Sequence, residues 1–153
     1  GEDGAGADEF VITVDVKAGC TRTLIEGCRF DQHASSTGQT HHVKLTGASD
    51  QVTIRDCWMY IIGAAGVACI GGDTTLSTKV LIERCVLTCD NEPGIELLTG
   101  TTGIIRDCDF FTDLATIDAA IVADGCAQFE NRYVEVGGEA SAATYVGVPS
   151  VDD

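Results

Sequence analysis

The sequence predicts an all-β solenoid of about five coils, with three short strands in each coil. A seven-residue motif, centred on cysteine in most of its copies, recurs along the chain. Its cysteines are separated by 29, 28 and 23 residues, which is the spacing of a stacked repeat. Apolar and polar residues alternate at period two, which indicates strands, and no long 3.6-residue stripe favours a helix.

Each copy of the motif predicts a strand, a sharp turn and a second strand. The copies span residues 24–30, 53–59, 81–87 and 104–110, with a degraded fifth at 128–134. The turn is expected at the fourth position, where most copies carry residues that tolerate a left-handed backbone. These residues are Gly27, Asp56, Arg84, Asp107 and Asn131.

A shorter apolar run before each copy predicts the remaining strand of the coil. Each run is followed by a glycine, and the runs are 14–16, 43–45, 67–69, 95–97 and 121–123. Leucine-rich repeats have a similar period, but they need a Leu-x-x-Leu-x-Leu frame and an asparagine ladder. Neither is present, so a three-stranded coil is the better prediction.

Stacking the copies places equivalent residues in columns with about 4.8 Å between coils. Three inward columns are expected: Ile25, Ile54, Ile82, Ile105 and Phe129; Cys28, Cys57, Cys85 and Cys108; and Phe30, Met59, Leu87 and Phe110. An outward column between the first two alternates in charge: Glu26, Arg55, Glu83, Arg106 and Glu130. Opposite charges on neighbouring strands attract, so this ladder specifies register more than it adds stability.

The chain contains eight cysteines, which we expect to be mostly buried and reduced. An inward cysteine behaves as a small hydrophobic residue. Parallel Cβ vectors on stacked strands make a disulfide dihedral hard to reach, so an axial disulfide in the column is the less favoured alternative. Cys69 is expected in the core, whereas Cys20, Cys89 and Cys126 are expected at strand edges or turns, where they could be exposed.

The recurring Ile-x-(Asp/Asn)-Cys-x-(Phe/Leu) pattern resembles the right-handed parallel β-helix, the pectate-lyase-like superfamily, of the kind found in phage structural and surface proteins. The resemblance covers about residues 9–148 and implies that fold. Residues 1–8 are then a flexible acidic arm and residues 149–153 a short tail. Because unrelated functions share this fold, the resemblance implies little about activity.

The charge balance excludes several classes of partner. With 24 acidic and 9 basic residues the formal net charge is −15. A nucleic-acid surface needs clustered Lys and Arg, and an anionic membrane also attracts basic residues. We therefore expect neither nucleic acid nor membrane as a partner.

Two groups of residues are weak candidates for chemistry. His33, His41 and His42 could form a zinc or copper site with Asp31, but adjacent histidines in an extended segment point to opposite faces. The carboxylates nearest the turns are Asp56, Asp107 and Asp109. Hydrolysis of a glycoside needs two carboxyl groups across a cleft, and no matched pair is evident in adjacent coils. We expect no catalytic residue, no metal and no cofactor.

The ends of the predicted solenoid suggest a structural function. Open ends expose unpaired strands, so we expect an obligate partner or a homo-oligomer, in particular a trimer. Trp58 and Tyr133 are predicted in one outward column as interface residues. We expect a phage capsid decoration (cement) protein that binds the major capsid protein or another shell protein. It would assemble in a reducing host cytoplasm and function on the virion surface.

The alternative function is carbohydrate recognition. In this interpretation Trp58 and Tyr133 stack on sugars. The chain would then be a β-helix domain of a tail spike or of an extracellular polysaccharide-active protein.

Overall fold

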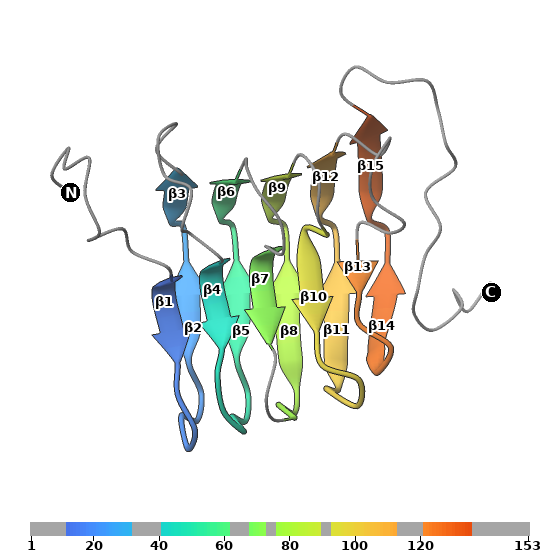
Figure 1. Cartoon of the computed structure of the whole chain (residues 1–153). Coiled ribbons are helices and arrows are strands. Elements are labelled where there is room, and N and C mark those ends of the chain that lie inside the picture. Colours follow the sequence, from blue (N-terminus) through green and yellow to red (C-terminus); the bar gives the residue numbers. More distant parts are fainter. Residues whose placement is uncertain are drawn as a thin grey trace, which may run out of the picture.

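The fold is a parallel β-solenoid, as the sequence predicts. The computed structural model describes residues 12–31, 41–61, 68–72, 76–89, 93–112 and 121–135, and the regular elements in these ranges are all strands. They form three parallel sheets of five strands each (Figure 1). Consecutive strands belong to different sheets, so each coil contributes one strand to every sheet.

The three sheets are the walls of the solenoid. Sheet 1 contains β1 (Ile12–Val16), β4 (His41–Leu45), β7 (Ala68–Gly72), β10 (Ile95–Leu97) and β13 (Ile121–Val122). Sheet 2 contains β2 (Leu24–Glu26), β5 (Thr53–Arg55), β8 (Val80–Glu83), β11 (Gly103–Arg106) and β14 (Cys126–Phe129). Sheet 3 contains β3 (Arg29–Asp31), β6 (Trp58–Ile61), β9 (Val86–Cys89), β12 (Asp109–Thr112) and β15 (Arg132–Glu135).

The turn between sheets 2 and 3 is the same in every coil. Its first residue has a positive φ between 50° and 62° in each case. The residues at this position are Gly27, Asp56, Arg84, Asp107 and Glu130. A single left-handed residue redirects the chain from one wall to the next, and the cost is lowest for Gly and small for Asp.

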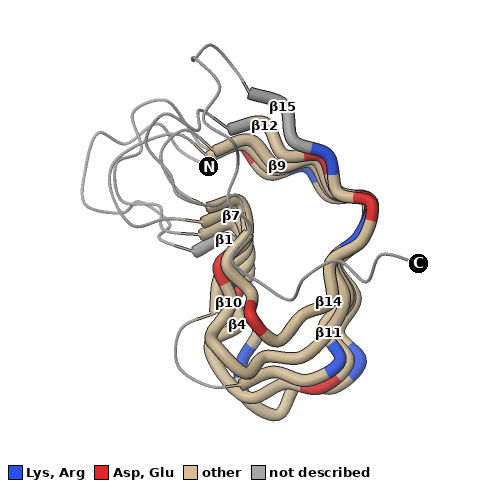
Figure 2. The backbone as a smooth tube through the Cα atoms, turned by 90° about the vertical axis from the view of Figure 1, so that its right-hand side faces the viewer, with Lys and Arg blue, Asp and Glu red and all other residues tan. Residues whose placement is uncertain are grey.

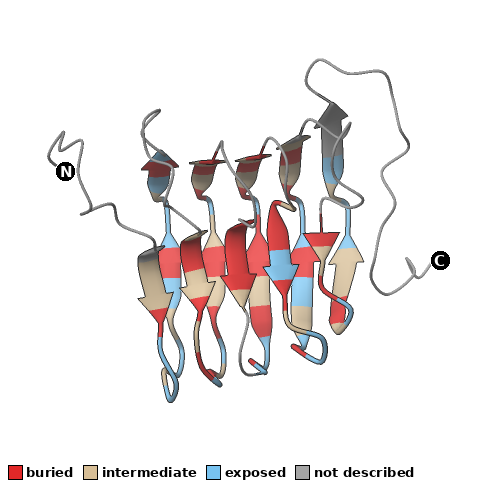
Figure 3. Cartoon of the chain, viewed as in Figure 1, coloured by how far each residue is buried: buried red, intermediate tan, exposed pale blue. Residues whose placement is uncertain are grey.

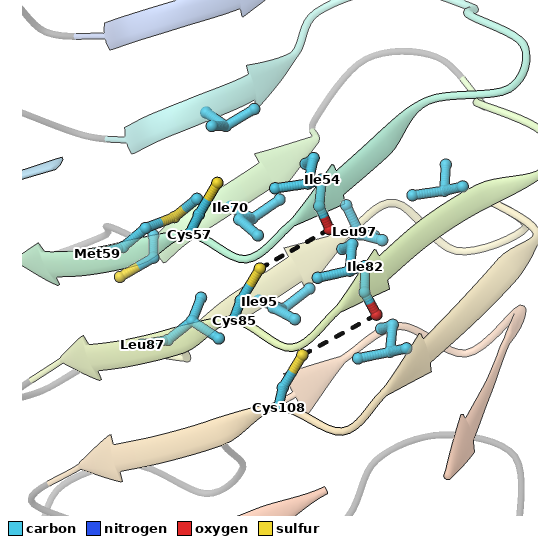
Figure 4. Packing of buried hydrophobic residues seen from close by; sticks show 14 of the residues in the cluster. Ile54, Cys57, Met59, Ile70, Ile82, Cys85, Leu87, Ile95, Leu97 and Cys108 are labelled. Atoms are coloured by element: carbon cyan, nitrogen blue, oxygen red, sulfur yellow. Dashed lines mark hydrogen bonds between the residues drawn. The ribbon is translucent and has the colours of Figure 1, made fainter. Parts of the chain in front are cut away.

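The core lies between the walls and consists of stacked apolar columns. In Figure 3 the buried residues recur at matching places in successive strands. Ile54, Ile82 and Ile105 are fully buried, and Figure 4 shows Cys57, Cys85 and Cys108 in the same packed core as Ile54 and Ile82. The predicted inward columns are therefore present in the central coils.

The last coil has a register that differs by one residue from the sequence prediction. Gln128 pairs with Ile105, and Phe129 pairs with Arg106. Phe129 is therefore in the outward column, where it is exposed, and Glu130 occupies the turn. The predictions that Phe129 is a core residue, that Glu130 is the fifth member of the charge ladder and that Asn131 occupies the turn are wrong.

Asn131 occupies the cysteine position of the last coil and supplies a polar end to the column. Its Oδ1 accepts a hydrogen bond from the backbone N–H of Cys108 at 3.1 Å. Its Nδ2 donates to the carbonyl of Ile105, also at 3.1 Å. The bond to Ile105 is equivalent to the contact that the thiols of Cys85 and Cys108 make with the preceding coil, and the bond from the N–H of Cys108 is a second contact between the amide and that coil.

The domain boundaries predicted from the sequence fall partly outside the described residues. The described strands begin at Ile12 and end at Glu135, within the predicted range 9–148. The predicted arm, residues 1–8, and the predicted tail, residues 149–153, both lie outside the described residues.

Gly103 should be difficult to replace, because a Cβ atom at this position would overlap the carbonyl group of Val80 in the adjacent coil. Gly103→Ala is expected to reduce the free energy of unfolding by about 1–3 kcal/mol, since the backbone of β8 must move. Gly72→Ala is the matched control, because its Cβ would meet nothing closer than 3.4 Å. Urea denaturation followed by circular dichroism measures both variants, and equal stability would contradict the predicted overlap.

Candidate binding faces

The outward charge ladder of sheet 2 is divided into two ion pairs. Arg55 contacts Glu26 at 2.7 Å, and Arg106 contacts Glu83 at 2.7 Å. Arg55 and Glu83 are paired in register, but the described part of the chain has no ion pair within 4.0 Å between them. The alternation predicted for the first four members is present, and Figure 2 shows charged positions of successive coils overlying one another.

Glu83 differs from the other members of the ladder because its side chain is only 5% exposed. Arg106 donates to its carboxylate through Nε and Nη2, and Arg84 approaches at 3.1 Å. These contacts, Arg106 first, hold the pKa of Glu83 below its ordinary value. Glu83 is therefore a buried anion between two cations rather than a solvated surface charge.

A second set of ion pairs follows the turns. Arg84 donates two hydrogen bonds to Asp56, at 2.8 and 2.9 Å, and this contact lowers the pKa of Asp56. Arg132 similarly contacts both carboxylate oxygens of Asp109, at 2.6 and 2.7 Å. Bidentate pairs of this kind fix the orientation of both side chains. These contacts hold both carboxylates as partners of arginine, Asp56 at the turn between sheets 2 and 3 and Asp109 in β12 of sheet 3.

The outward side of sheet 2 is also unusually apolar. Four large hydrophobic side chains are exposed in the described part of the chain, and three of them lie on this sheet: Leu24, Ile104 and Phe129. Their exposed fractions are 54%, 40% and 41%. Leu24, Leu81 and Ile104 belong to one column in register, next to the charge ladder, and Thr53 stands between Leu24 and Leu81. We call this surface the sheet-2 face; its members are Leu24, Leu81, Ile104, Phe129 and the ladder residues.

The outward side of sheet 3 carries a small aromatic cluster. The rings of Trp58 and Tyr60 are stacked with centroids 5.9 Å apart and planes inclined by 12°. The guanidinium carbon of Arg29 lies 4.4 Å from the centroid of the Trp58 ring, a cation–π contact. We call Arg29, Trp58 and Tyr60 the sheet-3 cluster.

The prediction that Trp58 and Tyr133 share one outward column is wrong. The backbone of Tyr133 pairs with Phe110, which is in register with Leu87 and Met59 in the core. Arg132 is the residue in register with the Trp58 column. The side chain of Tyr133 lies outside the described residues. Tyr60 is the aromatic neighbour that the sequence reasoning missed, although its position two residues after Trp58 indicates the same face.

The histidine-rich segment does not form a metal site in its described part. His42 is buried; its Nε2 donates to the carbonyl of Tyr60 at 2.8 Å, and its ring stacks on Phe30. Burial lowers the pKa of His42, so the ring is neutral at pH 7. His41 is only half-buried, which agrees with the prediction of opposite faces. Among the described residues no three His, Cys, Asp or Glu side chains are grouped to hold a metal ion, and His33 lies outside them.

The thiols of the cysteine column are directed at backbone carbonyl groups. Cys28, Cys57, Cys85 and Cys108 each donate to the carbonyl two residues earlier, at distances from 3.2 to 3.4 Å. The hydrogen bond with Cys108 is the main factor that raises the pKa of Cys85 to about 12. The eight cysteines of the chain are all free in the structure, as the sequence predicts for the column.

The other cysteines are more buried than expected. Cys69 is in the core as predicted, but Cys89 and Cys126 are also buried, with exposed fractions of 1% and 0%. Burial raises the pKa of Cys126 to about 11. The prediction that these two residues could be exposed is wrong, because the residues at strand ends still face the interior; Cys20 is half-buried.

Comparison with known proteins leaves the fold without an assigned family. No family model, curated protein or solved structure matches the chain. The residues that the structure describes include no helix long and apolar enough to cross a membrane. The function must therefore be argued from the two outward faces.

Proposed function

We propose that the chain is a non-enzymatic structural protein of a virion, and specifically a phage capsid decoration protein on the outer surface of the shell. Its solenoid would be of the right-handed, pectate-lyase-like kind. Its partner would be the major capsid protein or another shell protein, and the bound form a homotrimer. The observation that carries the proposal is the sheet-2 face, with Leu24, Ile104 and Phe129 exposed beside a row of ion pairs.

An exposed apolar column on a flat, regular wall favours contact with another protein. Contiguous apolar surface bordered by polar groups is typical of an interaction site. Leu24 lies in the first coil and Ile104 in the fourth, with Thr53 in the same column in the second coil. Phe129 lies in the fifth coil in the neighbouring column, in register with Arg106, so exposed apolar side chains occur at both ends of the described stack. The charged residues beside it, Arg55 and Arg106 among them, would set the orientation of a partner more than its affinity.

The distribution of charge supports a position on the outside of a particle. Long segments of the sequence carry acidic residues and no basic ones. Residues 1–16 contain five Asp and Glu without any Lys or Arg, and residues 107–131 contain six. Such segments repel packaged nucleic acid and favour solubility, which suits the outer surface.

Binding to purified particles tests the proposal. The chain should co-sediment with virions from its source at a fixed molar ratio to the shell protein. A double variant, Leu24→Asp with Ile104→Asp, should lose at least tenfold in affinity, because two charges would have to be desolvated at the interface. Its melting temperature should change little, since both side chains are exposed.

Ala48→Asp is the matched control, because Ala48 is exposed in the turn between β4 and β5, away from the sheet-2 face. It should bind like the unmodified chain. Sedimentation velocity of the isolated chain measures the expected trimer. Absence of the chain from particles, or full binding by the double variant, would contradict the proposal.

A second candidate function is carbohydrate binding by the sheet-3 cluster. The observation in its favour is the parallel stacking of Trp58 and Tyr60, since aromatic rings of this kind can receive a sugar face. However, Arg29 already covers one face of Trp58, so a sugar would have to displace a cation–π contact. A glycan array read with the unmodified chain and with Trp58→Ala distinguishes the two functions.

A further inference from the structure

Cys69 and Cys89 bring their sulfur atoms together inside the solenoid, although they belong to different walls. Cys69 is in β7 of sheet 1, and Cys89 is the last residue of β9 in sheet 3. Their Sγ atoms lie 3.1 Å apart, and both side chains are buried. A disulfide needs a separation of about 2.05 Å, so a movement of about 1 Å would bring the two sulfurs to bonding distance.

The geometry of this pair differs from that of the cysteine column. Cys57, Cys85 and Cys108 follow successive coils of one parallel stack, and their thiols are directed at carbonyl groups (Figure 4). Stacked parallel strands keep their Cβ vectors parallel, which is unfavourable for the dihedral angle of a disulfide. Cys69 and Cys89 approach from two walls, so this restriction does not apply to them.

We propose that Cys69 and Cys89 form a disulfide that joins sheet 1 to sheet 3 in the middle coil when the protein meets an oxidising environment. The bond would close the loop of residues 69–89, which contains the whole of β8. It would also fix the end of β9 against β7. The proposal concerns a modification of the chain itself and does not depend on the proposed function.

A hydroperoxide is the oxidant whose size suits a buried pair. One cysteine thiolate attacks a peroxide oxygen, the O–O bond breaks, and a sulfenic acid and hydroxide form. The second thiolate then attacks the sulfenic sulfur, the S–O bond breaks, and the S–S bond forms with loss of hydroxide, which is protonated to water. In total two thiols lose two electrons, and one hydrogen peroxide becomes two waters.

Burial makes this reaction slow at neutral pH. Desolvation raises the pKa of the Cys69 thiol, and its contact with Cys89 acts in the same direction. Since the thiolate is the reactive form, the rate should rise as the pH is increased. The bond is thus expected to form slowly in the folded protein and then to persist, because the sulfurs are shielded from reductants.

Peptide mapping of the full chain tests the proposal. The reduced protein is exposed to hydrogen peroxide at pH 8.5, quenched with acid, alkylated in denaturant and digested without reductant. Mass spectrometry should find one dominant cross-link between the peptides that carry Cys69 and Cys89, with six thiols alkylated. The oxidised protein should melt roughly 5–10 °C higher than the reduced protein, as expected for a loop of this length.

Two substitutions and one control complete the experiment. Cys69→Ala and Cys89→Ala should each abolish both the cross-link and the rise in melting temperature. Cys126→Ala removes another buried thiol, whose Sγ contacts the carbonyl of Thr101, and should retain both. Mapping of the unmodified chain decides the question even where a variant fails to fold. A dominant link elsewhere, such as Cys57 with Cys85, or eight alkylated thiols after oxidation, would overturn the proposal.

Discussion

Cys85→Arg is expected to reduce the free energy of unfolding by more than about 4 kcal/mol, enough to unfold a domain of ordinary stability. Cys85 is fully buried in the middle coil, between Cys57 and Cys108 of the neighbouring coils. Its thiol contacts the carbonyls of Glu83 and Ile54, at 3.4 and 3.7 Å. A guanidinium group at this position would be a buried charge without a carboxylate, and it would also overpack the coil. Urea denaturation followed by circular dichroism measures the loss.

Two control variants separate burial from the loss of the thiol. Cys85→Ala leaves only a small cavity and should cost about 1–2 kcal/mol. Cys28→Arg makes the same chemical change in the same column, but Cys28 is half-buried in the first coil, so the guanidinium can reach water. It should cost much less than Cys85→Arg. Equal melting temperatures for Cys85→Arg and Cys85→Ala would show that the column does not face the core.

The central coils could be predicted from the sequence because an inward apolar residue and an outward charged residue recur at the same positions in every copy. Ile54, Ile82 and Ile105 each precede a charged residue by one position, and the alternation at period two assigns one to the core and the other to solvent. The signs of Arg55 and Glu83 then agree with a parallel in-register stack. Periodicity and charge are independent observations, and both indicate the same register.

The register of the last coil could not be predicted in the same way, because polar residues and hydrogen bonds rather than apolar side chains determine it. Phe129-Glu130 imitates the Ile-Glu pair of earlier copies, so a pattern of apolar and charged residues favours a register shifted by one. The inward positions of this coil carry polar residues, Gln128 and Asn131. The hydrogen bonds of Asn131 to the preceding coil, rather than hydrophobicity, fix its register.

Contacts between different walls were also not predictable from the repeat. Cys69 and Cys89 are in different strands of one coil, and no other coil repeats the pair, so no column reveals it.

The burial of the Glu83 side chain also could not be predicted from the repeat. The side chains of its neighbours in the ladder, Arg55 and Arg106, are 36% and 48% exposed, and only the structure shows that Glu83 is buried between Arg84 and Arg106.

Glu83→Arg is therefore expected to be the most damaging reversal in the charge ladder, with a loss of about 3 kcal/mol in the free energy of unfolding. Removing one partner of a buried ion pair typically costs 3–5 kcal/mol, and the partial exposure of both arginines places this case at the lower end. The new cation would lie between Arg84 and Arg106 and repel both. Because the repulsion is electrostatic, the loss should be larger at low salt than at high salt.

Reversing the charge of Arg106 as well tests whether the loss of stability in Glu83→Arg comes from the contact between these two side chains. Adding Arg106→Glu to Glu83→Arg should recover part of the loss, whereas strictly additive effects would show that the two residues do not interact. Glu26→Arg is the matched control, because Glu26 is exposed in the first coil and its reversal should cost less than about 1 kcal/mol.

Glu83→Gln supplies a pH test of the same contact. The pKa of Glu83 is lowered in the folded state, chiefly by Arg106, so its stabilising contribution is complete above the unfolded value of 4.5 and is lost as the pH falls below it. The stability difference between the unmodified chain and Glu83→Gln should accordingly shrink between pH 5 and pH 3. A difference that stays constant over this range would contradict the assignment of Glu83 as a buried anion, because a neutral group at this position does not titrate.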